Sequence, residues 1–204
     1  MPQFVVLLRG VNVGKGNRLP MASFRALLEA EGLSEVATLL NSGNAVFRSA
    51  KRSALAHAQA IRARLQRDLG LSVLVVVKSS PDFLAAIANS PFAVPEEHHA
   101  RFLLAFAQTE AATRGLAALL PVPEPPEQLS TGAHATYLYC ARGILDGRLG
   151  SAVLGKHGRE VTTRNWATVL KLKAMLERVS PNPSIERTPS GKLRLPTAPA
   201  HVER

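Results

Sequence analysis

The apolar residues of the first 78 positions form short runs of two alternating kinds, and their order restricts the fold more than any other feature of the chain. Apolar side chains at helical spacing predict helices over residues 20–31 and 55–69, each followed by a glycine that stops it. Compact apolar runs predict four strands, at residues 4–8, 36–40, 45–47 and 73–77. The order strand, helix, strand, strand, helix, strand is that of a ferredoxin-like α+β lobe.

The turn between the second and third strands, Asn41-Ser42-Gly43-Asn44, consists of residue types typical of hairpins. A right-handed crossover through the first helix makes the first two strands parallel, so both end at the same edge of the sheet. We therefore expect this turn to lie beside the loop Gly10–Leu19, which follows the first strand.

The second half of the chain has a similar but less regular rhythm. Apolar patterns predict strands at residues 101–107, 127–130 and 136–140, and helices near residues 83–87, 116–120 and 149–154. A long amphipathic helix follows from Trp166 to Val179, with Thr162 or Thr163 available as its N-cap. No residue-level repeat links the two halves, so any duplication is one of shape.

The last 25 residues contain five prolines and no apolar periodicity, which predicts a disordered tail. We therefore expect an N-terminal ferredoxin-like subdomain at residues 1–78, a C-terminal α+β subdomain at residues 79–179 that ends in the long helix, and the tail at residues 180–204.

Hydrophobic residues make up 46% of the 204 positions, enough for a sizeable core without disulfides. The only cysteine, Cys140, lies in an apolar run and is expected to be a buried thiol, which fits a reducing cytoplasm. The first apolar run is closed by Arg9, so it has no secretory pattern, and no run approaches the ~18 residues needed to span a bilayer. We expect a cytoplasmic protein without a membrane partner.

The net charge of +10 is unevenly distributed along the chain. Basic segments at residues 1–78 and 141–179 flank an acidic segment at residues 79–140. If the two basic segments meet in space, their field attracts phosphates or nucleic acid. The alternative is that these are ordinary solvated cations on helix faces.

The loop Gly10–Leu19 combines glycine, amide and basic side chains that suit an anion. Charge and amide hydrogens come from Arg9, Asn12, Lys15, Asn17 and Arg18. The loop is neither a phosphate-binding P-loop, because glycine rather than a hydroxyl residue follows Lys15, nor a dinucleotide fingerprint. A structural alternative stays open, in which the glycines allow tight turns and the asparagines satisfy the loop backbone.

Two further groups complete the candidate ligand-binding set, at the hairpin turn and the start of the last helix: Asn41, Ser42, Asn44, Arg164, Asn165 and Lys171. The turn residues extend the site or serve the hairpin alone. A helix N-terminus attracts anions, and the seven-residue spacing of Arg164 and Lys171 places them near one helical stripe. Trp166 is interpreted as a core anchor, with a base-stacking platform as the alternative.

The sequence contains no established signature of a metal centre or catalytic set. His98 and His99 are adjacent and cannot share a helix face, and no H-E-x-x-H, C-x-x-C or G-x-S-x-G motif occurs. We interpret His57, His134 and His157 as surface or structural residues. We therefore expect no metal site and assign no catalytic residue or cofactor.

Three ordered motifs, Leu8–Gly14 with Leu19–Met21, Asn41–Phe47 and Thr162–Leu172, resemble the bacterial domain-of-unknown-function family 1697. The resemblance covers about residues 3–178. It implies an α+β fold of two ferredoxin-like subdomains packed together, and no established activity. The chain departs from the family pattern where Lys15-Gly16 replaces the usual Gly-Lys order, which shifts the basic side chain by one position. Ala167 stands where asparagine is common, which removes one amide from the helix start.

The leading hypothesis is a binding protein for a phosphate-bearing ligand, either a nucleotide or a nucleic acid, through the basic loop and its neighbouring turn. One alternative is an enzyme that acts on a small anionic substrate, with arginine and asparagine side chains stabilising developing charge. A third is a protein-interaction module whose motifs are structural. The sequence does not indicate the oligomeric state.

Overall fold

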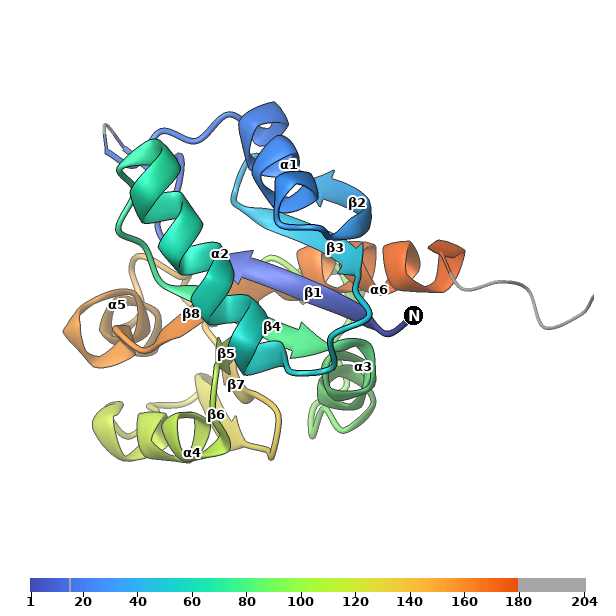
Figure 1. Ribbon diagram of the computed structural model, residues 1–204. Helices are drawn as coiled ribbons and strands as arrows, with labels where there is room; N and C mark the ends of the chain where they lie inside the picture. Colours follow the sequence, from blue (N-terminus) through green and yellow to red (C-terminus); the bar gives the residue numbers. More distant parts are fainter. Residues whose placement is uncertain (15, 180–204) are drawn as a thin grey trace, which may run out of the picture.

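The structure is a computed structural model that describes residues 1–14 and 16–179. Its first half forms an antiparallel four-stranded sheet in the order β2-β3-β1-β4, with two helices on one face (Figure 1). The elements are β1 (Gln3–Leu8), α1 (Met21–Ala30), β2 (Ser34–Leu39), β3 (Asn44–Arg48), α2 (Ala54–Leu69) and β4 (Val75–Ser79). This confirms the predicted ferredoxin-like lobe. The last strand starts two residues later than expected. Val73 is buried in the core, but the pairing with β1 begins only at Val75.

The second half repeats this topology with the strand order β6-β7-β5-β8. Its elements are β5 (Phe102–Ala107), α4 (Glu110–Leu119), β6 (Gln128–Thr131), β7 (Thr136–Tyr139), α5 (Arg148–Leu154) and β8 (Val161–Asn165). The order strand, helix, strand, strand, helix, strand therefore occurs twice, and the expected pair of ferredoxin-like subdomains is confirmed. The remaining elements are α3 (Ser80–Ala88), two short 3₁₀ turns, η1 (Glu96–His98) and η2 (Lys156–Gly158), and α6 (Trp166–Val179).

The segment before α6 differs from the prediction. Thr162 and Thr163 are not N-caps but residues of β8, where they pair with Phe106 and Ala105 of β5. The cap is Asn165, whose Oδ1 accepts a hydrogen bond from the Thr168 N–H at 3.0 Å. Arg164 therefore projects from a strand rather than from a helix N-terminus.

The continuous apolar run of β1 is buried on both faces, which connects the two sheets. Phe4, Val6 and Leu8 pack under α1 and α2, whereas Val5 and Leu7 face a second cluster that includes Phe102, Leu104 and Phe106 of the other sheet. The helices α3 and α6 close this shared layer. A third cluster lies between the second sheet and the helices α4 and α5.

Within the described ranges no helix is long and apolar enough to cross a membrane. Cys140 is buried directly after β7, as expected, and burial raises the pKa of its thiol to about 12.

Candidate functional site

The loop after β1 and the turn after β2 lie side by side, as the strand topology predicts. The Leu8 N–H donates to the Gly43 carbonyl at 2.8 Å, and the Asn12 amide donates to the Asn41 carbonyl at 2.7 Å. Gly43 has a φ of +68°, and a Cβ there would lie 2.6 Å from Leu8 Cβ, so only glycine fits. The two segments are therefore packed in direct contact.

The asparagines of this loop hold it closed. Asn12 and Asn17 both have left-handed backbone, with φ of 56° and 47°. The Asn12 side chain accepts a hydrogen bond from the Leu19 N–H at 2.9 Å and donates to the Leu19 carbonyl at 2.8 Å. Asn17 donates to the Gly10 carbonyl at 3.2 Å. Both amide hydrogens of Asn12 are engaged within the protein, which matches the structural alternative for that side chain.

Arg164, on β8 of the second lobe, contacts the loop after β1 and the turn after β2. We call this contact region between the two lobes the junction. All five N–H donors of Arg164 are used there. Its guanidinium donates to the Leu8 carbonyl at 2.7 Å and to the Ser42 carbonyl at 3.1 Å. Further bonds join it to Asn44 Oδ1, Thr162 Oγ1 and the Thr163 carbonyl. Every acceptor is a neutral oxygen. Burial lowers the pKa of Arg164 to about 10.

Arg9 makes the reciprocal contact, from the first lobe into the second. Its guanidinium donates to the Leu154 carbonyl at 2.6 Å, the Gly155 carbonyl at 3.3 Å and the Val161 carbonyl at 2.7 Å, and also to the Gly158 carbonyl. These carbonyls belong to the C-terminal end of α5 and the residues that follow, where a cation is favourable. Desolvation lowers the pKa of Arg9.

Other predicted site residues are exposed or serve local structure. Arg18, Asn41, Ser42 and Lys171 are exposed, and their side chains make no hydrogen bond or ion pair within residues 1–14 and 16–179. Asn44 is buried in β3 and donates to the Leu39 carbonyl at 3.1 Å, and Asn165 caps α6. Lys15 lies outside the described residues, as does the predicted tail at residues 180–204.

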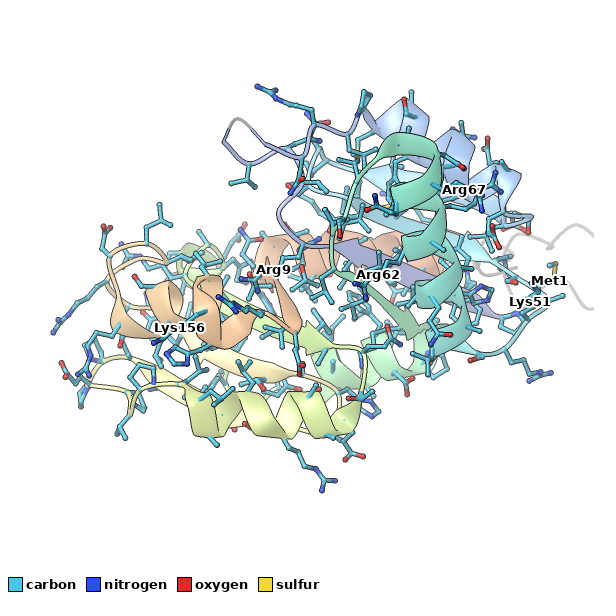
Figure 2. All side chains as sticks on the ribbon, turned by 60° about the vertical axis from the view of Figure 1, so that its left-hand side comes forward. Met1, Arg9, Lys51, Arg62, Arg67 and Lys156 are labelled. Atoms are coloured by element: carbon cyan, nitrogen blue, oxygen red, sulfur yellow. The ribbon has the colours of Figure 1, made fainter. Side chains whose placement is uncertain are left out.

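The structure adds two cations that the sequence analysis did not single out as ligands, Arg62 on α2 and Lys156 in η2. Figure 2 shows them on the face where the lobes meet, with Arg9 between them in that view. Both are exposed, and neither has an ion-pair partner among the residues described. The sequence does indicate that Arg62 has no ion-pair partner on its helix. The residue four positions later is the neutral Gln66, whereas Arg64 has Asp68 at that spacing and pairs with it.

At this junction, arginine side chains donate to main-chain carbonyls, and exposed cations lie around them. No group of three or more histidine, cysteine, aspartate or glutamate side chains that could hold a metal occurs in the described part of the chain. His57, by contrast, is buried against Phe4 and Phe47, and its Nε2 lies 3.1 Å from the Lys51 carbonyl, in accordance with a structural role.

Comparisons with known proteins identify a family but no activity. A family model described as a protein of unknown function (DUF1697) matches residues 1–137. The conserved bacterial protein SP0830 from Streptococcus pneumoniae has a similar solved structure, with a TM-score of 0.72, 24% sequence identity, and coverage of 86% of this chain and 98% of that one. No curated protein matches. At this identity the structural likeness concerns the fold alone.

Proposed function

The chain belongs to the DUF1697 family of proteins of unknown function, and we propose that it binds nucleic acid through phosphate contacts on the face where its two lobes meet. The observation that supports this proposal is a set of exposed cations that borders the junction and has no carboxylate partner among residues 1–14 and 16–179. Arg62 comes from the first lobe and Lys156 from the second, so the positive charge extends across both (Figure 2). The exposed Arg18 belongs to the loop that meets the turn after β2.

The geometry favours a polymer over a small anionic ligand. A site for one phosphate needs several donors converging on one point. The two arginines nearest the junction instead direct their donors at protein oxygens, five of five for Arg164 and at least four of five for Arg9. The exposed cations stand on separate elements, a distribution suited to successive phosphates along a strand.

Because most of the N–H donors of Arg9 and all of those of Arg164 are bonded to protein oxygens, the structure favours the enzyme alternative less. Arginines that stabilise a developing charge need N–H groups directed at the substrate, and Arg164 has none left. The proposal therefore assigns ligand contact to Arg18, Arg62 and Lys156, with Lys15, Asn41, Ser42 and Lys171 as further candidates. It assigns Arg9, Asn12, Asn44 and Arg164 to holding the surface in shape.

Fluorescence anisotropy with a labelled single-stranded oligonucleotide tests this proposal over a range of salt concentrations. We expect binding that weakens as salt rises. The double variant Arg62→Ala with Lys156→Ala should reduce the slope of log K against log salt by about 1.4, because each lost phosphate contact on a single strand contributes about 0.7. The variant should leave the melting temperature unchanged, since both side chains are exposed.

A matched control separates position from total charge. Arg25 is exposed on α1 and pairs with Glu29 at 2.8 Å, so the variant Arg25→Ala with Arg114→Ala removes two cations that already have carboxylate partners. We expect it to retain the wild-type slope. If both double variants reduced the slope equally, binding would depend on net charge alone, which would contradict a defined binding face. The absence of salt-sensitive binding would also contradict the proposal.

A further inference from the structure

A small cavity opens at one end of the second sheet, at the opposite end of β5 from the strand position that Arg9 contacts. It has a volume of about 260 Å³. Apolar walls come from Phe92, Val94 and Phe102, and polar groups from His98, Gln128 and Tyr139. The connection between α3 and β5 supplies one side, and the strands β5, β6 and β7 supply the other.

Aromatic rings shape this cavity. Phe92 meets Phe102 edge to face, with ring centroids 5.6 Å apart at 87°. The His98 ring stacks on Tyr139 with centroids 5.3 Å apart at 23°. Phe102 also contacts Trp166 at 5.3 Å. Walls of this kind favour a flat, unsaturated ligand, because ring faces and edges attract one another beyond simple burial.

The polar groups lie together at one side of the cavity. Gln128 pairs directly with Tyr139 across the β6–β7 ladder, so their side chains share one face of the sheet. The Tyr139 hydroxyl lies 3.1 Å from His98 Nδ1. The Gln128 amide makes no side-chain hydrogen bond within the described ranges, which leaves both of its N–H donors and its carbonyl oxygen available.

From these features we propose that the cavity binds a neutral heteroaromatic ring of the nucleobase class, with its hydrogen-bonding edge against Gln128 and Tyr139. A glutamine amide pairs well with adjacent donor and acceptor atoms on such a ring, as it does with adenine. The described residues that line it include no lysine, arginine, aspartate or glutamate, so the lining supplies no fixed positive charge to pair with a phosphate. The volume lies below the roughly 300–1,000 Å³ of sites for drug-sized ligands, which suits a single ring system without sugar.

This site is independent of the proposed nucleic-acid face. Phe102 at the cavity begins β5, and Ala107 at the other end of that strand pairs with Val161, whose carbonyl accepts a hydrogen bond from Arg9. A six-residue strand spans about 17–20 Å. A free base carries no phosphate, so the two proposals succeed or fail separately.

Calorimetric titration of the full chain with adenine tests the proposal, followed in parallel by fluorescence of Trp166, the chain's only tryptophan. We expect saturable binding that changes this fluorescence. Gln128→Ala and Tyr139→Phe should each weaken binding roughly tenfold, because each removes one hydrogen-bonding group at the ligand edge. In the calorimetric titration, Ala93→Trp should fill the cavity and abolish the binding heat, and Arg62→Ala should leave binding unchanged.

Indole serves as a probe of the same shape that lacks the acceptor nitrogens and the amino group of adenine. It should bind at least tenfold more weakly. Three results would overturn the proposal: no heat with adenine at millimolar concentration, equal binding of adenine and indole, or adenine affinity insensitive to Gln128→Ala. Gln128 is exposed, so its variant remains informative even if Ala93→Trp fails to fold.

Discussion

Replacement of Arg164 tests whether the junction is held by a buried cation on neutral oxygens. The variant Arg164→Ala removes five hydrogen bonds, but not every acceptor loses its only partner. The Leu8 carbonyl still accepts from Thr162 Oγ1 at 3.1 Å, and Ser42 lies in an exposed turn that water can reach. Asn44 Oδ1 is buried and is left unpaired, at a cost of about 1–3 kcal/mol.

The cavity left by the arginine side chain adds to this cost, and we expect Arg164→Ala to lose about 3–5 kcal/mol of unfolding free energy. Arg164→Lys retains the charge but has only three donors, and should lose about 2 kcal/mol. The measurement is guanidinium-induced unfolding followed by Trp166 fluorescence. Arg101→Ala, at an exposed position, should stay within about 0.5 kcal/mol of wild type.

A loss of less than about 1 kcal/mol for Arg164→Ala would refute this reasoning. It would mean that the guanidinium contributes little to the contact between the lobes, and its donors would again be candidates for a ligand. A large loss for Arg164→Lys, equal to that of alanine, would instead show that the planar five-donor geometry accounts for the whole effect.

Three further outcomes follow from the same structure. Gly43→Ala should cost more than about 2 kcal/mol, because its Cβ meets Leu8 at 2.6 Å, whereas Gly70→Ala, at φ +65° in open space, should cost about 1 kcal/mol in the same unfolding assay. Arg9→Ala should speed amide hydrogen exchange in η2 and the residues after it, and leave α1 and α2 unchanged, as mass spectrometry of peptides can establish. Because burial raises the pKa of Cys140 from 9.0 to about 12, the folded state holds its proton more tightly than the unfolded one. Stability should therefore be unaffected by this thiol below pH 9 and fall by up to about 1.4 kcal/mol per pH unit from there toward pH 12, a loss that Cys140→Ala should remove.

The first lobe could be predicted from local pattern because each of its elements has an unambiguous period and a glycine or hairpin boundary. The strand β8 could not be predicted. Thr162 and Thr163 are β-branched residues that also favour helix N-caps, and the choice is made by pairing with β5, which lies more than 50 residues earlier. Pairing with a distant strand therefore overrode the local preference of these two residues for a helix N-cap.

The candidate site was predictable only in its topology. Parallel strand ends place the loop beside the turn, and the contact follows. The partners of Arg9 and Arg164 are mostly main-chain carbonyls, which every residue carries, so no side-chain pattern identifies them. Arg9 and the Gly158 carbonyl, for example, are separated by 149 positions. Exposure was also unpredictable, because a basic residue in a loop or strand has no periodicity that shows whether it faces solvent.

The burial of β1 on both faces has a consequence for synthesis on the ribosome. The sheet of the first lobe is complete at Ser79, yet the cluster around Val5 and Leu7 also needs α3, strands of the second sheet and the α6 side chains that end with Leu176. Roughly 100 further residues must be made first, which takes about 5–20 s at 5–20 residues per second. During that interval the nascent lobe presents an apolar sheet face that α3 covers only in part, a surface that chaperones bind.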